Sequence, residues 1–362
     1  MIALHARRLE KAPTQGCALA HGARGLDIPI LSRTARVVPQ NTMTNETMPT
    51  LAELQAIRER VAAHIHRTPM MRSRYLSAAT GYDVSLKCEL FQRTGSFKPR
   101  GMLARLFHMA PQERGRGAIT FSAGNAAQGL AYAGGIAGVP TTVVMPQAAS
   151  PIKAEATRQY GAKVVLHGTA ADAYDRCMEI CRQENLVFVP SFDDPMLMRG
   201  HASLGLEVIE DVGDVDAVVT GIGGGGLIGG VAMARQAAGK TFRLFGVEPE
   251  GAAGMTRSLE AGKPVRLEKV TTIADGLGAP FVGDHCFPIV HDKVEKVVVL
   301  PDTAIVEAMK VLLSRCKLMA EGAGASSVAA LLAGAIPLPK GAKVCCVISG
   351  GNVDLSRLKD LI

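Results

Sequence analysis

Tryptophan is absent from this 362-residue sequence, and aromatic residues make up only 4% of it. A surface that stacks the bases of single-stranded nucleic acid needs aromatic side chains, so this class of partner is disfavoured. The formal net charge is +7, but no run of five or more Lys/Arg residues occurs. Basic residues scattered in this way are typical of a solvated surface, and we expect no nucleic-acid partner.

The sequence also lacks a membrane-spanning stretch and a metal-binding pattern. No apolar run reaches about 18 residues without a charge or a glycine. Cys177 and Cys181 are spaced i, i+4, but no second Cys/His pair stands at the spacing of a zinc site. Cys345 and Cys346 lie in an apolar run, which is typical of buried, reduced thiols. These features predict a cytoplasmic protein with no membrane partner.

The first 48 residues differ from the rest of the chain. They show no sustained periodicity, and their basic residues outnumber their acidic ones. We expect a disordered extension. Two origins remain open, namely a mis-set start with Met43 or Met48 as the initiator, and a targeting segment, since such segments are rich in Arg and poor in acid. We favour the first because the stretch is only weakly amphipathic.

From Thr50 onward, helix and strand patterns alternate. Thr50 and Glu53 predict a capping box for a helix that runs to His66. Further helices are predicted at residues 126–137, 152–160, 170–184, 195–211 and 227–238, and strands at 117–122, 141–146, 162–167, 186–190, 216–220, 242–247 and 343–348. This alternation predicts an α/β protein whose parallel sheets are covered by helices on both faces. The units are too many for one sheet, so we expect two lobes.

A lysine stands at the start of one predicted helix. Residues 95–101 read Gly-Ser-Phe-Lys-Pro-Arg-Gly and open a helix that runs to Met109. Ser96 is the predicted N-cap, and Pro99 is tolerated in a first turn. Lys98 lies in that turn, where the helix dipole disfavours a cation, which is a condition for an amine nucleophile. A lone lysine is more often an ordinary surface residue, so this motif needs others beside it.

A run of glycines directly follows a predicted strand and precedes a helix. Residues 221–227 read Gly-Ile-Gly-Gly-Gly-Gly-Leu. Consecutive glycines before a helix leave backbone N–H groups unobstructed, and such a turn can bind a phosphate. Gly221, Gly223 and Gly226 also satisfy G-x-G-x-x-G, and Glu248 stands near the distance expected for a ribose-binding acid. An NAD-dependent dehydrogenase is therefore a competing interpretation.

Two more polar turns follow predicted strands. Residues 122–125 read Ser-Ala-Gly-Asn, a turn that can hold a carboxylate, and residues 349–352 read Ser-Gly-Gly-Asn. A dinucleotide site needs only the glycine run. A lysine, a carboxylate turn, a phosphate loop and a hydroxyl together suit a phosphorylated aldehyde and an amino acid.

These four motifs, in this order, resemble the serine/threonine dehydratase family of pyridoxal-phosphate enzymes. The family has the tryptophan-synthase-β-like fold, fold type II, which also includes serine racemase. The resemblance runs from about residue 50 to 361. It implies a large pyridoxal-phosphate-binding domain of residues 49–115 and 194–362, and a small substrate-closing domain of residues 116–193. It also implies a homodimer or homotetramer.

The resemblance assigns roles motif by motif. Lys98 is the lysine that binds the cofactor covalently and accepts the Cα proton. Phe97 and Gly276 flank the two faces of the cofactor ring, Asn125 binds its phenolic oxygen, and Ser349 faces its pyridine nitrogen. The implied phosphate-binding residues are Gly223, Gly224, Gly225, Gly226 and Leu227. The residues implied for the substrate carboxylate are Ser122, Ala123, Gly124 and Asn125.

The resemblance implies β-elimination from L-threonine or L-serine, which yields 2-oxobutanoate or pyruvate and ammonia. Serine racemases commonly have a serine at the position of Ala123, and alanine has no proton to give, so racemisation is disfavoured. The family often has histidine where this chain has Ala126. The substrate therefore stays open, and hydroxyaspartate or a hydroxyectoine-derived amino acid remains an alternative.

Some members of the family bind a divalent ion after the phosphate loop. Glu248 is present here, but residues 252–254 read Ala-Ala-Gly, without the expected aspartate. We therefore predict no metal, and Glu248 is expected to cap the end of a strand.

Overall fold

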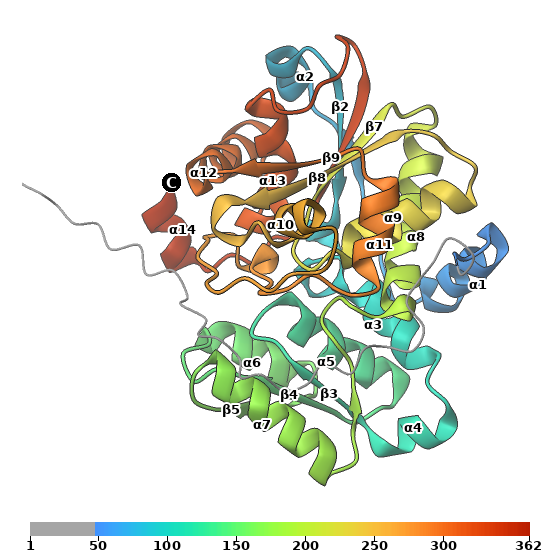
Figure 1. Ribbon diagram of the computed structural model, residues 1–362, viewed down its shortest axis with the longest axis vertical. Helices are drawn as coiled ribbons and strands as arrows, with labels where there is room; N and C mark the ends of the chain where they lie inside the picture. Colours follow the sequence, from blue (N-terminus) through green and yellow to red (C-terminus); the bar gives the residue numbers. More distant parts are fainter. Residues whose placement is uncertain (1–47) are drawn as a thin grey trace, which may run out of the picture.

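The computed structural model describes residues 48–362, and the disordered extension or mis-set start predicted for the first 48 residues falls almost wholly outside them. The chain forms two sheets, and each has helices on both of its faces. Figure 1 shows the larger sheet above a smaller teal and green lobe. The predicted α/β class with two sheets is confirmed.

The larger sheet has six strands, and it is parallel except at one edge. Its order is β1-β2-β10-β7-β8-β9, and β1 alone runs antiparallel to its neighbour. The strands are β1 (Met70–Arg72), β2 (Asp83–Cys88), β7 (Ala217–Gly221), β8 (Arg243–Pro249), β9 (Lys296–Leu300) and β10 (Lys343–Ile348).

Helices cover both faces of this sheet. The helices α8 (Pro195–Val212), α9 (Gly226–Ala237) and α11 (Cys286–Lys293) lie on one face, and α12 (Asp302–Val311) and α13 (Gly322–Leu332) lie on the other. Along β7, Val218 packs in the apolar core on the side of α8, α9 and α11, whereas Ala217 and Val219 pack in the core on the side of α12 and α13. This alternation, with both sides buried, explains why the strand reads as a continuous apolar run.

The smaller sheet has four parallel strands in the order β5-β4-β3-β6. They are β3 (Ala118–Phe121), β4 (Thr141–Met145), β5 (Lys163–Leu166) and β6 (Val187–Phe188). The helices α5 (Asn125–Ala137) and α6 (Pro151–Gln159) pack on one face, and α7 (Ala170–Gln183) packs on the other. The chain then returns to the larger lobe through α8, whose N-cap Asp194 accepts hydrogen bonds from the N–H groups of Met196 and Leu197.

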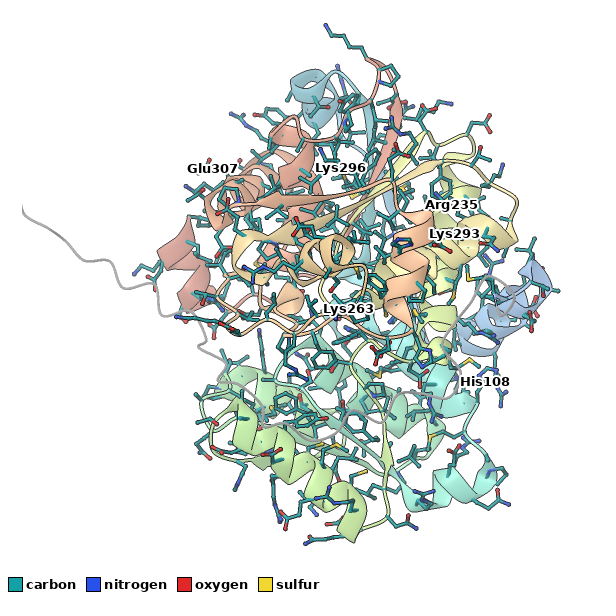
Figure 2. The ribbon with its side chains drawn as sticks, viewed as in Figure 1. His108, Arg235, Lys263, Lys293, Lys296 and Glu307 are labelled. Atoms are coloured by element: carbon teal, nitrogen blue, oxygen red, sulfur yellow. The ribbon has the colours of Figure 1, made fainter. Side chains whose placement is uncertain are left out.

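The far ends of α9 and α11 are tied together. Figure 2 labels Arg235 on α9 and Lys293 on α11, and Arg235 donates a 2.8 Å hydrogen bond to the Lys293 carbonyl and a 3.0 Å one to the Phe242 carbonyl. Through these bonds, the last turn of α9 is joined to the start of β8 and to the end of α11.

The remaining helices complete the two lobes. They are α1 (Leu51–Ala62), α2 (Arg74–Thr80), α3 (Lys98–Phe107), α4 (Pro111–Arg116), α10 (Gly254–Ala261) and α14 (Leu355–Leu361). The predicted capping box of Thr50 and Glu53 is confirmed, although α1 ends before His66. The elements β1, α2, β2 and β9 were not predicted, because their runs are short and lack a clear period.

One predicted cap is wrong. Ser96 does not cap the lysine helix, because Phe97 occupies the N-cap position and α3 begins at Lys98. Ser96 is instead extended and forms an isolated antiparallel bridge with Gly350. The pairing partner lies more than 250 residues away in sequence, so local capping rules could not reveal it.

Candidate active site

The sheet topology brings three of the four motifs together. The strands β2, β10 and β7 are neighbours and run parallel, so their carboxyl ends lie at one edge. The chain after β2 leads to Lys98, β10 leads directly to Ser349, and β7 leads to the glycine run. The fourth motif, residues 122–125, follows β3 of the smaller sheet. Ligands of open α/β sheets bind at this edge.

Backbone hydrogen bonds join the lysine loop to the Ser349 loop. The Phe97 N–H donates to the Ser349 carbonyl at 3.1 Å, and the Gly351 N–H donates to the Gly95 carbonyl at 2.9 Å. The position of Lys98 is therefore set by the loop after β10 as well as by its own helix.

Lys98 faces the interior of the site. Its Nζ donates a 2.6 Å hydrogen bond to the carbonyl of Ser191 and lies 5.0 Å from the centre of the Phe97 ring. Removal from water lowers the pKa of the Lys98 amine to about 8. The direction agrees with the sequence prediction, and desolvation is its largest cause.

The glycine run is closely packed. Gly225 has φ +105°, and a Cβ there would lie 2.7 Å from the Cβ of Cys286. A Cβ on Gly224 would overlap the ring of Phe192, which follows Ser191 in the chain. The Lys98 amine and the glycine run therefore contact adjacent residues. Since α9 begins at Gly226, its first N–H groups have no carbonyl one turn earlier and are free to bind an anion.

The loop of Gly276 lies against the glycine run. A Cβ on Gly223 would stand 3.2 Å from the Gly276 carbonyl oxygen. Gly276 lies in the short 3-10 turn Asp275–Leu277, and Ser349 is 5% exposed at the end of β10. The loop of Gly276, predicted to face the cofactor ring, is thus in contact with the predicted phosphate-binding turn.

The turn of residues 122–125 keeps its polar groups partly exposed. The Gly124 N–H donates to the Ser122 hydroxyl at 3.2 Å, and no heavy atom lies within 4 Å of a Cβ built on Gly124. Open space beside a turn at the start of α5 suits a small carboxylate.

Asn125 lies in a chain of hydrogen bonds that the sequence did not predict. Its Oδ1 accepts from Asn352 Nδ2 at 2.8 Å, and Asn352 Nδ2 also donates to the Thr94 carbonyl at 2.6 Å. On the other side, Asn125 Nδ2 donates to Glu321 at 2.5 Å. Glu321 stands alone in an apolar stretch, Leu-Met-Ala-Glu-Gly, and this is the one sequence signal that could have drawn attention to it.

A buried ionic network lies behind the lysine helix. Arg100 Nε is 2.7 Å from Glu89, Arg100 Nη1 is 2.7 Å from Glu207, and Lys87 Nζ is 2.6 Å from Glu207. None of these four residues is more than 4% exposed. Because Arg100 is two residues from Lys98, the network fixes the first turn of α3.

Glu248 neither is free to bind a ribose nor merely caps the end of a strand, as the sequence had suggested. Its carboxylate accepts from the N–H groups of Met255 and Thr256 at 2.7 and 2.9 Å and from the Thr256 hydroxyl at 2.7 Å. It therefore caps α10, and this buried carboxylate is already engaged by three donors. Among residues 48–362, no group of three or more His, Cys, Asp or Glu side chains could hold a metal ion.

A half-buried lysine of lowered pKa, a helix start with free N–H groups and a glycine run in contact with the Gly276 loop define a class of protein. They fit an enzyme that holds a phosphorylated aldehyde on a lysine and leaves space for an amino acid. Pyridoxal phosphate is the cofactor with this chemistry.

The chain belongs to the family of pyridoxal-phosphate-dependent enzymes, whose sequence model matches residues 61–350. It is 40% identical to the L-threonine ammonia-lyase of Thermotoga maritima over 316 residues, 87% of this chain and 78% of that protein. It is 36% identical to the L-threo-3-hydroxyaspartate ammonia-lyase of a Pseudomonas species over 84% of this chain and 95% of that protein. The NAD-dependent interpretation is therefore wrong.

A solved structure supports the fold. The processed form of threonine deaminase isoform 2 from Solanum lycopersicum superposes with a TM-score of 0.79 at 32% identity, covering 92% of this chain and 98% of that one. The fold is thus that of fold type II pyridoxal-phosphate enzymes. None of the helices in residues 48–362 combines the length and the apolar character that crossing a membrane requires.

Proposed function

We propose that this enzyme deaminates L-threonine or L-serine, giving 2-oxobutanoate or pyruvate and ammonia. The observation that carries the proposal is the Lys98 amine, which is held at 2.6 Å from the Ser191 carbonyl and has a pKa of about 8. The next residue, Phe192, packs against the glycine run. A relative named L-threonine ammonia-lyase at 40% identity supports the substrate class.

The residues divide the work as follows. Bound pyridoxal phosphate supplies an electron sink that makes the Cα proton of an amino acid acidic. The N–H groups of residues 223–227 would hold its phosphate, and Phe97 and Gly276 would flank its ring. Asn125 would donate to its ring oxygen, and the neutral Ser349 hydroxyl would face its ring nitrogen.

Lys98 and the turn at residues 122–125 act on the amino acid itself. An amine with a pKa of about 8 is partly unprotonated near neutral pH, so Lys98 can accept the Cα proton. The turn of Ser122, Ala123, Gly124 and Asn125 holds the substrate carboxylate and thereby fixes the direction of the Cα–H bond.

Ala123 favours elimination over racemisation. Its methyl group packs with the apolar cluster beside α5, where it has no proton to donate. Racemisation needs a proton donor on the face of Cα opposite to Lys98, and this turn offers none at position 123.

A hydroxyaspartate is the second candidate substrate. The Pseudomonas relative is named L-threo-3-hydroxyaspartate ammonia-lyase, and Lys153 of α6 lies 3.7 Å from Asp275, in the same short turn as Gly276. A second carboxylate on the substrate could pair with this lysine.

Keto-acid release from a panel of D- and L-hydroxy amino acids tests the proposal. We expect 2-oxobutanoate from L-threonine and pyruvate from L-serine, with slower release from the D-isomers. Release from hydroxyaspartate alone would favour the second candidate. The absence of keto acid from every member, or conversion of L-serine mainly to D-serine, would overturn the proposal.

We also infer how the enzyme moves, how it assembles and where it works. The small domain of residues 116–193 is expected to close on the substrate, and the family resemblance supports a homodimer or homotetramer. Free, buried thiols such as Cys345 and Cys346 support the cytoplasm, where thiols stay reduced. Light scattering of the purified enzyme tests the oligomeric state.

A further inference from the structure

Glu321 lies among the loops of the candidate site, although no motif pointed to it. It precedes the first residue of α13, where a side chain would ordinarily cap the helix, but its carboxylate makes no cap bond. The residue is 8% exposed. Its Oε1 accepts a 2.5 Å hydrogen bond from Asn125, and its backbone N–H donates to the Gly350 carbonyl at 3.2 Å.

The surrounding glycines leave space for this carboxylate. A Cβ on Gly350 would overlap Glu321 Oε1, and a Cβ on Gly276 would stand 3.8 Å from it. Gly350 follows Ser349, and Gly276 belongs to the loop that packs on the glycine run. The carboxylate therefore lies beside the loops that present Ser349 and Gly276, two of the predicted cofactor-binding residues.

The two partners of Asn125 fix which way its amide points. Asn352 donates to Asn125 Oδ1 at 2.8 Å, so the oxygen must face Asn352. The nitrogen must then face Glu321, which accepts one of its two protons. A flipped amide would set N–H against N–H on one side and oxygen against oxygen on the other. The second N–H proton of Asn125 is left for a ligand.

The electrostatic surroundings of Glu321 are mixed. Burial raises the pKa of its carboxyl to about 7, while Lys153 of α6, the Asn125 hydrogen bond and Lys98 of α3 act in the opposite direction. Asp275 of the neighbouring 3-10 turn adds to the increase. The carboxyl therefore exchanges its proton within the range in which enzymes usually work.

We propose that Glu321 is a positioning residue that, together with Asn352, holds the Asn125 amide so that its remaining N–H faces the ring oxygen of the cofactor. The proposal concerns the cofactor site and is independent of which amino acid is the substrate. Loss of the Glu321 carboxylate frees the amide to rotate and weakens the hydrogen bond to the ring oxygen. The colour and the retention of the cofactor report this bond directly.

The first experiment compares holoenzymes of the parent, Glu321→Ala and Glu321→Gln. The visible absorption of the cofactor is recorded from pH 5.5 to 9, and the rate of cofactor loss is measured after dilution. Glu321→Ala is expected to lose cofactor about 2- to 10-fold faster, as for one net hydrogen bond. Glu321→Gln keeps an oxygen that can accept from Asn125, so its loss rate should stay within about twofold of the parent.

The pH titration separates positioning from simple packing. The parent's absorption should change with a midpoint near pH 7, and Glu321→Gln should lack that change because an amide does not titrate there. Glu248→Gln is the matched control, since burial also raises the pKa of Glu248 to about 7 but its partners are in α10. This control should keep the parent's titration.

A double substitution tests the route through Asn125. If Glu321 and Asn352 both act on that amide, the loss rate of Glu321→Ala/Asn352→Ala should fall short of the product of the two single effects. Independent, multiplicative effects would overturn the proposal. So would a Glu321→Gln enzyme that keeps the titration near pH 7, which this near-isosteric variant can report even if Glu321→Ala fails to fold.

Neither measurement needs an amino-acid substrate. An inactive substrate panel would therefore leave this test unaffected.

Discussion

The ε-amine of Lys98 donates a 2.6 Å hydrogen bond to the carbonyl oxygen of Ser191. Lys98 begins α3, whereas Ser191 stands between β6 of the smaller sheet and α8 of the larger lobe. The amine is thus held where the chain crosses from one lobe to the other. Its neighbour Phe192 packs against the glycine run, so this crossing segment contacts both the lysine and the predicted phosphate-binding turn.

Replacing Lys98 by Ala should reduce keto-acid release by about 10³-fold or more, because the variant loses the proposed acceptor of the Cα proton. Cofactor can still bind through the N–H groups at the start of α9. Lys263→Ala is the control, since Lys263 is an exposed lysine, labelled in Figure 2. Turnover retained in Lys98→Ala would contradict the assignment.

Cofactor-free enzyme should capture pyridoxal phosphate covalently with a midpoint near pH 8. Below pH 8 the Lys98 amine is mostly protonated and unreactive, so the rate should rise about tenfold per pH unit and then level off. The rate is followed by absorbance after mixing. A rate that keeps rising toward pH 10.5, the ordinary value for lysine, would show that the amine is solvated.

Replacing Arg100 by Met should lower the free energy of unfolding by about 3–5 kcal/mol, because it leaves Glu89 and Glu207 buried with less compensation. Arg67→Met is the matched control. Arg67 pairs with Glu210 and Asp211, but its side chain is 52% exposed, so the loss should be below about 1 kcal/mol. Urea denaturation measures both, and equal losses would disprove the role of burial.

Replacing Gly225 by Ala should release the cofactor. A positive φ costs an L-residue about 1–2 kcal/mol, and the added Cβ would press on Cys286. The measurement is cofactor content per chain after gel filtration. Gly115→Ala on α4 is the control, because no heavy atom lies within 4 Å of its Cβ position and its φ is not positive. A Gly225→Ala enzyme with full cofactor would contradict the prediction.

Local patterns were sufficient where a feature is local. The Thr50–Glu53 capping box and the alternation of β3, α5, β4, α6, β5 and α7 depend on residues close in sequence, and the structure has them near the predicted positions. The division into domains and the residue roles at the site stay predictions. Short elements such as β1 and β9 were missed because three to five residues carry too little periodicity.

Contacts that form only in the folded chain decided the rest. Ser96 looked like a helix cap until its bridge to Gly350 placed it in extended backbone. Glu248 looked like a ribose-binding acid or a strand end, but hydrogen bonds from Met255 and Thr256 occupy it. Residue type alone cannot reveal whether a carboxylate is already satisfied.

The sequence by itself determined the class of fold and the four motifs, because helix and strand periodicity and glycine-rich turns are set by neighbouring residues. Only the tertiary structure decided that Lys98 is desolvated and that Glu321 meets Asn125, 196 residues away. The pKa of a lysine and the orientation of an amide depend on which distant groups surround them once the sheets are assembled. Those distances are fixed by the packing of the whole chain.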